Sequence, residues 1–581
     1  MSQSTPTRVP SSKSRILLSS VFGPYAQDDE YGSRVLNPME LYHNQVTRLQ
    51  GAASLRMFHR SFGLMMIQAN IDAPCTLLDF PTQDRFLEEI RDGEYDIVGI
   101  SSIIPNVGKV ERMCALIREH SPRTTIVVGG HIANAPDIEN IIDADHIVKG
   151  DGVRWFRNFL GQDPGQAIRH PLTHAGHGTR TYGVTERTKT GDTAAVLLPS
   201  VGCPVGCNFC STSAMYGGKG KFVNFYETGD ELFQVMNQIA DKLRVRSFFA
   251  LDENFLLHRQ RALRLLELME ENNKSWSLYV FSSARVLKSY SIDQLIRLGI
   301  SWVWMGLEGE NSKYPKLSGV DTHELIREFQ SHGIRVLGST IIGMEEHTPE
   351  NMDEVINYAI RHDTVFHQFM LYTPMPGTPL YEEHRREGTL LPESECPPPD
   401  VHGQLRFNYK HNNIRDGQEG EYLVEAFRRD FEVNGPSLVR MIRTTLAGYR
   451  RYKNHPNKRV SDRYRWEARL IPSTYAGLVR ASKKWFERLG LETAKISAVL
   501  DEIYEEFGLK TRLVSALLSP YILRKLEKEQ ERLENGWTYE PPTVYEKNAK
   551  ALAEEKAGLA RIKSHLPEIQ WATGQPSPAT E

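Results

Sequence analysis

The sequence has few cysteines, no long apolar run and no excess of charge of either sign. Only six of its 581 residues are cysteine, and Cys75, Cys114 and Cys396 are scattered, which predicts a reducing compartment without a disulfide framework. No apolar stretch is long enough to span a bilayer, and residues 1–14 lack the apolar centre of a signal peptide. Seventy basic against seventy-three acidic residues argue against electrostatic binding of nucleic acid by the whole molecule.

The other three cysteines form a Cys-x3-Cys-x2-Cys triplet, Cys203, Cys207 and Cys210, with Phe209 before the third. Thiolates hold iron–sulfur clusters, and a [4Fe–4S] cluster normally takes four of them. Because no fourth cysteine is close in sequence, one iron would keep an open position where a small molecule can chelate. A zinc knuckle is the alternative, but the sequence has no second pair of ligands to close a tetrahedral site.

This triplet resembles the cluster motif of the radical S-adenosylmethionine (SAM) enzymes. The resemblance implies that the amine and carboxylate of SAM chelate the open iron. It also implies that reductive cleavage of SAM gives a 5'-deoxyadenosyl radical, which takes a hydrogen atom from an unactivated C–H bond. An external electron donor of the flavodoxin or ferredoxin type follows from this chemistry. Because such a cluster is oxygen-sensitive, we expect a cytoplasmic protein.

After the triplet, short apolar segments alternate with segments of helical periodicity. Six βα repeats with right-handed crossovers are too few for a closed eight-stranded barrel, so they predict a partial (β/α)6 barrel within residues 193–392. The candidate strands are 195–202, 247–253, 277–284, 302–309, 336–343 and 366–374.

Ligands of parallel α/β sheets bind at the carboxyl ends of the strands. The resemblance places SAM contacts there, at Phe209, Asp252, Glu253, Ser283, Arg285, Glu308, Ile341 and Gly343. The residues allow other interpretations. Asp252-Glu253-Asn254 is also a typical helix N-cap, and ordinary polarity at a strand end explains Ser283, Arg285 and Glu308 equally well.

Residues 15–165 show a second alternation, with candidate strands at 15–22, 76–80, 96–102, 124–130 and 146–150, which predicts a doubly wound, Rossmann-like sheet. Its glycine-rich strand ends resemble the cobalamin-binding domain that often precedes a radical SAM barrel. The resemblance implies cobalamin contacts from Ser101, Ser102, Gly129, Gly130, His131, Gly150, Asp151 and Gly152. The Asp-x-His-x-x-Gly motif is missing, so we expect cobalamin to bind without a histidine below the cobalt. A flavodoxin-like domain without cobalamin is the alternative.

The remaining segments are predicted from composition. Residues 1–14 are expected to be disordered, 166–192 to be a linker whose histidines are solvated, and 541–581 to be a charged helix and a flexible tail. Residues 393–540 are predicted to be a helical domain. Within it, 427–495 carry seventeen Lys/Arg against six Asp/Glu. Two interpretations remain for this basic stretch, a helical lid with a solvated basic face, or a surface that contacts anionic lipid headgroups at a membrane or another acidic partner.

The two predicted cofactor domains suggest a C-methyltransferase that acts on an unactivated carbon of a lipid, a terpenoid or another secondary metabolite. Radical cyclisation or rearrangement without methyl transfer is one alternative, and a non-catalytic sensor of cobalamin or the cluster is another. No catalytic residue beyond the cluster ligands is predicted. The expected cofactors are a [4Fe–4S] cluster, SAM and cobalamin.

Overall fold

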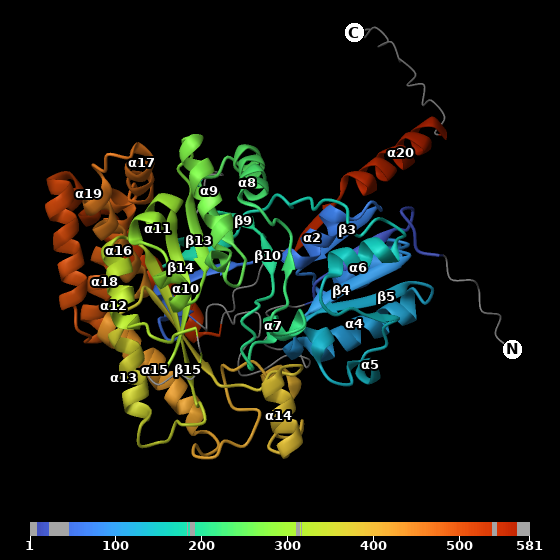
Figure 1. Ribbon diagram of the computed structural model, residues 1–581, viewed down its shortest axis with the longest axis horizontal. Coiled ribbons are helices and arrows are strands. Elements are labelled where there is room, and N and C mark those ends of the chain that lie inside the picture. The colour runs from blue at the N-terminus through green and yellow to red at the C-terminus, as the bar shows by residue number, and fades with distance from the viewer. Residues whose placement is uncertain are drawn as a thin grey trace, which may run out of the picture.

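The computed structural model describes residues 9–22, 46–182, 184–185, 192–309, 314, 316–536 and 543–565. The chain forms an amino-terminal α/β unit, a central parallel sheet and a carboxy-terminal group of helices (Figure 1). None of the helices described is both long enough and apolar enough to cross a membrane. The predicted fold class is confirmed by this arrangement. Part of the predicted disordered start, 1–8, lies outside the described residues, while Ser14 is already buried ahead of the first strand.

The amino-terminal sheet has the strand order β17-β3-β1-β4-β5-β6. Its parallel strands are β1 (Ile16–Ser19), β3 (Cys75–Asp79), β4 (Ile97–Ser102), β5 (Thr125–Gly130) and β6 (His146–Ile147). Successive side chains point to opposite faces, so Leu17 and Ile16 enter separate apolar layers on the two sides of the sheet. The helices α2 (Phe62–Asn70), α3 (Gln83–Asp92), α4 (Val107–His120) and α6 (Gly152–Phe159) accompany the strands. This is why the strands read as continuous apolar runs.

An edge strand of this sheet comes from the other end of the chain. β17 (Val544–Lys547) pairs antiparallel with β3, and α20 (Ala549–His565) follows it. The Asn548 side chain accepts from Cys75 N–H (3.2 Å) and donates to the Ala73 carbonyl (2.8 Å). The prediction of a charged helix and flexible tail after 541 therefore missed a strand, because four mostly polar residues carry no periodic signal that distinguishes an edge strand.

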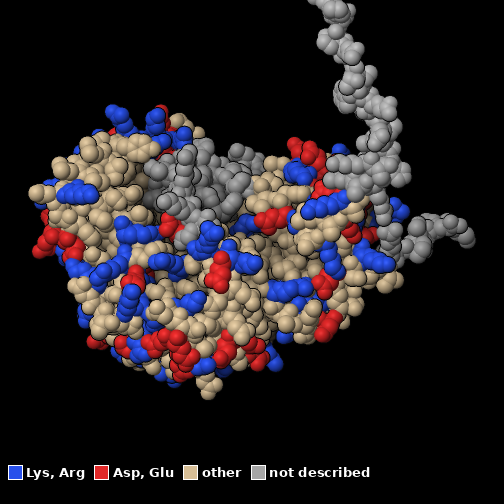
Figure 2. Space-filling view, turned by 90° about the horizontal axis from the view of Figure 1, so that it is seen from above, with Lys and Arg blue, Asp and Glu red and all other residues tan. Residues whose placement is uncertain are grey.

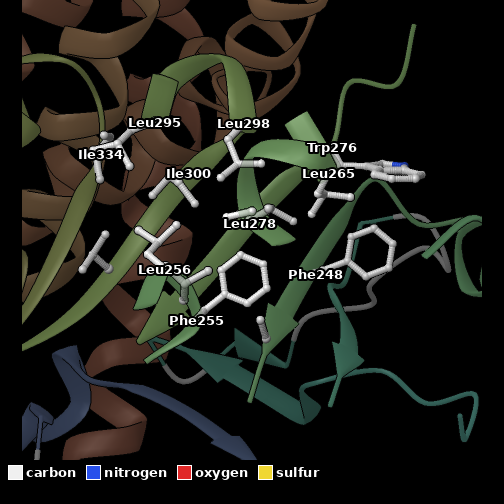
Figure 3. Packing of buried hydrophobic residues seen from close by; sticks show 14 of the residues in the cluster. Phe248, Phe255, Leu256, Leu265, Trp276, Leu278, Leu295, Leu298, Ile300 and Ile334 are labelled. Carbon is white, nitrogen blue, oxygen red and sulfur yellow. The ribbon is translucent and has the colours of Figure 1, made fainter. Parts of the chain in front are cut away.

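The central sheet is parallel throughout, in the order β16-β15-β14-β13-β12-β9. Its strands are β9 (Ala195–Leu197), β12 (Ser247–Ala250), β13 (Ser277–Phe281), β14 (Ile300–Glu308), β15 (Arg335–Ile342) and β16 (Phe366–Leu371). Helices α8 (Gly229–Leu243), α9 (Arg259–Glu271), α11 (Ile292–Leu298), α12 (Thr322–Ser331) and α13 (Met352–Arg361) lie between them in sequence. Leu278 and Ile300 from the sheet pack against Leu265 and Leu295 from the helices (Figure 3). This packing fixes the carboxyl ends of the strands on one edge.

The predicted linker is only partly irregular. Within it, β7 (His177–Thr181) and β8 (Val184–Thr185) form an antiparallel sheet with β2 (Leu55–Phe58). His170 is not a solvated loop histidine: its Nε2 accepts from Leu198 N–H at 2.9 Å and its Nδ1 donates to the Pro171 carbonyl. Burial lowers the pKa of His170 to about 4. The connection thus packs against the start of the central sheet.

The carboxy-terminal helices are α14 (Pro379–Glu387), α15 (Gln418–Asn434), α16 (Ser437–Tyr452), α17 (Lys458–Glu467), α18 (Ala476–Leu489) and α19 (Ala494–Glu534), which is kinked at Gly508. The predicted basic stretch over 427–495 lies in them, but it does not present a solvated basic face. Eleven of its seventeen basic side chains form ion pairs, namely residues 428, 429, 440, 443, 450, 453, 459, 463, 469, 483 and 488. Blue and red side chains are accordingly interspersed on the face seen in Figure 2.

Candidate functional site

The three predicted cluster cysteines lie on one loop between β10 (Ser200–Val201) and α7 (Ser211–Met215). All three are free and half-buried, and Cys210 caps α7 by accepting from Ser213 N–H at 3.5 Å. Gly206 has φ of 70°, and a Cβ there would lie 2.6 Å from the Lys219 backbone, so the turn requires glycine. Among the described residues no three Cys, His, Asp or Glu side chains converge on a single ion, as a zinc knuckle requires.

The thiols are buried enough to stay protonated while no cluster is bound. Burial raises the pKa of Cys203 to about 11 and also raises the pKa values of Cys207 and Cys210, which the nearby Lys316 ammonium partly offsets. Because thiolates are the form that ligates iron, cluster insertion here must release protons. The loop therefore has the donor set expected of a cluster site.

A compact aromatic group supports this loop. The Phe209 ring lies edge-on to Tyr314 (5.1 Å between centroids) and to Tyr372 (6.1 Å). The Lys316 ammonium lies 5.4 Å from the Phe209 ring and pairs with buried Glu308. Glu308 was predicted to contact SAM, but its carboxylate is already bound by Lys316. No sequence motif identifies Tyr314 or Lys316, which come shortly after β14 in the sequence.

At the end of β12 two neighbouring carboxylates have different environments. Asp252, also predicted to contact SAM, is buried against Arg261 (2.6 Å) and accepts from Ser200 Oγ (2.6 Å), so it has a structural ion pair instead. Glu253 has a buried Oε2 that finds no hydrogen-bond partner among the described residues. Burial, with the adjacent Asp252 charge, raises the pKa of Glu253 to about 7. Glu253 is therefore the carboxyl group available to a ligand at this strand end.

The remaining predicted SAM residues divide into two groups. Ser283 is half-buried and occupies the N-cap position of α10 (Ala284–Lys288), without a capping hydrogen bond from its side chain. Ile341 lines a cavity beside the cysteine loop. Arg285 is exposed on α10 and lines neither cavity. Gly343 is closed off: Phe407 covers it, its N–H donates to His347 Nδ1 (3.0 Å), and its carbonyl accepts from Tyr409 (3.2 Å). The predictions for Arg285 and Gly343 are therefore not supported by their placement.

A cavity of about 410 Å³, here called the glycine-lined cavity, separates the two sheets. From the amino-terminal unit come Ser101 and the strand-end residues predicted for cobalamin, and from the central unit come Val201, Tyr216 and Glu253. The predicted residues on its wall are Ser101, Gly129, Gly130, His131, Gly150, Asp151 and Gly152, whereas Ser102 lies next to them without lining it. The structure thus brings seven of the eight together.

The wall of this cavity fits a large, close-lying ligand. Gly130 has φ of 85°, and a Cβ there would lie 2.6 Å from the Ser102 carbonyl, so no side chain occupies the wall at this point. The buried Nδ1 of His131 and Oδ2 of Asp151 belong to residues that line the cavity and have no hydrogen-bond partner in the part of the chain described. The other carboxylate oxygen of Asp151, Oδ1, caps α6 by accepting from Val153 N–H (3.0 Å). Bare backbone and spare hydrogen-bonding groups are what a cofactor such as cobalamin would use.

A second cavity of about 400 Å³, here called the apolar chamber, lies beside the cysteine loop. All three parts of the chain line it, with His131 common to both cavities. The lining residues are Ile103, Ile104, Pro105, His131, Asn134, Phe209, Cys210, Ser211, Ile341, Met370, Leu371, Tyr372, Thr373, Met375, Pro376, Val401 and His402. None of them is Asp, Glu, Lys or Arg, so the chamber suits an uncharged, largely apolar molecule.

His402 is the polar group of the chamber that sequence reasoning missed. It is 4% exposed, and Gln404 N–H donates to its Nδ1 at 3.2 Å, so the neutral ring carries its proton on Nε2. That Nε2 has no partner among the described residues. Burial, helped by Arg48, lowers the pKa of His402 to about 4, which keeps the ring neutral. No sequence motif surrounds His402 that could have identified it.

Comparisons with known proteins agree with this geometry. Residues 51–160 match the B12 binding domain, and residues 197–359 match the Radical SAM superfamily. The bacteriochlorophyllide d C-8(2)-methyltransferase of Chlorobaculum tepidum is 24% identical over 58% of this chain and 78% of its own length. The anaerobic magnesium-protoporphyrin IX monomethyl ester cyclase of Rubrivivax gelatinosus is 22% identical over 52% and 60%. The solved radical SAM methyltransferase TsrM from Kitasatospora setae aligns over 78% of this chain and 99% of its own, with 16% identity and a TM-score of 0.46.

Proposed function

This chain is a radical SAM enzyme with a B12-binding domain, and on that premise we propose that it is a C-methyltransferase acting on an unactivated carbon of a small, uncharged molecule. Its cofactors are a [4Fe–4S] cluster, SAM and cobalamin. The proposal rests on the apolar chamber, which Cys210 and Phe209 bound on one side and Ile104 and His131 of the B12-binding domain bound on another.

The position of the chamber supports methyl transfer. A substrate in it lies against the cysteine loop, and through His131 it also lies beside the glycine-lined cavity. When bound, the cluster with SAM supplies hydrogen-atom abstraction and cobalamin supplies methyl transfer. Reactions that need two cofactors depend on holding the substrate in reach of both. We assign that positioning to the walls of the chamber.

The chain itself supplies orientation and the exclusion of water. Met370, Leu371 and Met375 make the chamber wall apolar, which keeps water away from a reactive carbon centre. His402 Nε2–H is placed to donate to one acceptor atom of the substrate. We assign cluster binding to Cys203, Cys207 and Cys210, and SAM contacts to Phe209, Glu253, Ser283 and Ile341.

The chamber also limits the substrate class. Because no charged side chain lines it, an ionised substrate would lose its hydration without gaining an ion pair. We therefore propose a neutral lipid, terpenoid or similar secondary metabolite with an acceptor oxygen or nitrogen. The reductant is proposed to be an external flavodoxin or ferredoxin, since each reductive cleavage of SAM consumes an electron that no residue of the chain supplies.

Radical cyclisation is the second candidate. One relative, the Rubrivivax gelatinosus protein, is named a cyclase, and the same two domains are matched here. Cyclisation uses hydrogen-atom abstraction without methyl transfer, so the two candidates give different products from SAM.

The test is anaerobic incubation of the reconstituted, cobalamin-loaded enzyme with SAM, a reductant and an extract of the host. We expect 5'-deoxyadenosine and S-adenosylhomocysteine to rise together. Deoxyadenosine alone would support cyclisation or rearrangement, and neither product from an enzyme with an intact cluster would support a sensor.

Alanine at Cys203, Cys207 or Cys210 should abolish deoxyadenosine formation, because each thiolate holds the cluster. Cys396→Ala, which removes a buried thiol outside the loop, is the matched control and should retain it. An active single variant at any of the three loop positions would contradict the assignment.

A further inference from the structure

Beyond the kink at Gly508, α19 carries an exposed apolar stripe. Leu509, Leu513, Leu517 and Tyr521 are 75%, 67%, 79% and 54% exposed, and their spacing of four residues puts them on one face of the helix. The other face holds the helix to the protein, because Ile522 and Leu526 are buried in the helical core. Single exposed apolar side chains are common on protein surfaces, but three leucines and a tyrosine aligned on one helix face mark an interaction surface.

The same stretch is strongly basic. Residues 508–526 contain Lys510, Arg512, Arg524 and Lys525 and no Asp or Glu. Within the part of the chain that the structure describes, none of these four side chains forms an ion pair; Arg512 and Lys525 lie instead over the rings of Tyr504 and Tyr521. The basic stretch at 427–495 differs, since most of its charges are neutralised internally by ion pairs.

The position of the helix leaves this face open. α19 forms the outer edge of the helical group, on the side away from the amino-terminal parallel sheet (Figure 1). A second copy of the chain is a poor occupant, because a symmetric contact through the stripe would bring Lys510 and Arg512 close to the same residues of the partner. The surface combines an apolar stripe with neighbouring basic side chains that form no ion pairs among the described residues. This combination matches the interface of a negatively charged membrane.

We propose that the 509–521 face of α19 lies on anionic membranes, with the four apolar side chains inserted at the headgroup boundary and the basic side chains on the lipid phosphates. This assignment does not depend on the proposed methyl transfer. It moves the predicted membrane contact from the basic stretch at 427–495 to a different helix. It also holds a protein with an apolar chamber at the surface of a bilayer, in which apolar molecules dissolve.

The test is co-sedimentation of the full-length protein with vesicles of phosphatidylglycerol and phosphatidylcholine in equal parts, or of phosphatidylcholine alone. We expect binding to the anionic vesicles, weakened by raised salt, and little binding to the neutral ones. The double variant Leu513→Gln/Leu517→Gln should reduce the partition coefficient at least tenfold. Lys510→Gln/Arg524→Gln should reduce it about 25-fold on anionic vesicles, at about fivefold for each charge.

The matched control is Leu172→Gln/Leu552→Gln, which changes two exposed leucines elsewhere and should bind like the parent. Because Leu172, Leu513, Leu517 and Leu552 are all exposed, we expect these variants to fold, and thermal melting of each one checks this. Equal binding by the parent and the Leu513/Leu517 variant would overturn the proposal. The proposal would also be overturned if the parent protein does not bind anionic vesicles and elutes as a dimer, while the Leu513/Leu517 variant elutes as a monomer. That result would make the stripe a self-association surface.

Discussion

At the scale of single residues, four residues that line the two cavities each have a buried polar atom without a hydrogen-bond partner among the described residues. The atoms are His131 Nδ1, Asp151 Oδ2, Glu253 Oε2 and His402 Nε2. A buried group left without a partner costs about 1–3 kcal/mol, so a fold retains one where a ligand completes it. Asp252 and Glu308, which also end strands, are satisfied by Arg261 and Lys316. Unsatisfied groups therefore mark ligand contacts better than strand-end polarity does.

Replacing His402 should uncouple methylation of the substrate from 5'-deoxyadenosine formation. His402→Phe removes the Nε2–H donor while keeping an aromatic ring, so the substrate should be held less firmly. The ratio of methylated product to 5'-deoxyadenosine should then fall by about five- to a hundredfold, the effect of one lost buried hydrogen bond. Product and deoxyadenosine are measured together by mass spectrometry.

His402→Gln provides the control for this prediction, because its amide keeps a donor and should restore much of the ratio. A purely structural role for His402 would lower both quantities in parallel. If the ratio is unchanged in His402→Phe, the positioning role is wrong.

At the scale of elements, a buried ion pair between two helices of the carboxy-terminal domain also contacts the segment that leads into the central sheet. Arg440 on α16 pairs with Asp430 on α15 at 2.7 Å, with both side chains almost fully buried. Arg440 also donates to the Thr364 carbonyl (2.8 Å), just before β16. Because β16 ends at the apolar chamber, this pair helps to set the position of the chamber wall.

Replacing one partner of this ion pair should destabilise the fold more than replacing both partners. Arg440→Met leaves Asp430 buried and uncompensated, which should lower the free energy of unfolding by about 3–5 kcal/mol. The double variant Asp430→Leu/Arg440→Met should recover most of that loss. Chemical denaturation of the cofactor-free protein measures both, with exposed Arg428→Met as the control. A single variant as stable as the parent would contradict the inferred burial.

Elements with strong local patterns could be predicted from the sequence, and those formed by distant contacts could not. The strands of both parallel sheets are continuous apolar runs buried on two faces, so their residues identify them. β17 is a short edge strand paired with distant β3, and β7 is the middle strand of a small sheet in which it pairs with distant β2, so their residues alone favour no structure. Asp151 caps the amino terminus of α6, a role that aspartate commonly has, whereas only a contact with cobalamin was predicted for it from the sequence.

At the scale of the whole molecule, the carboxy-terminal part of the chain completes both cofactor-bearing units. β17 extends the B12-binding sheet, Phe407 covers Gly343, and His402 enters the apolar chamber. The sequence allowed the order of the domains, the cysteine loop and most of the glycine-lined wall to be predicted. It could not show which strand-end groups are already neutralised or which distant segment closes the chamber, because both depend on tertiary contacts.

The central claim is that a methyl group from SAM reaches a carbon of a molecule held in the apolar chamber. The most direct measurement is anaerobic incubation with SAM labelled with a trideuteromethyl group, followed by mass spectrometry of the apolar extract. The account predicts a product that carries the labelled methyl group, formed together with 5'-deoxyadenosine and lost when Cys207 is replaced by alanine. Deoxyadenosine formed with a new but unlabelled product would contradict methyl transfer.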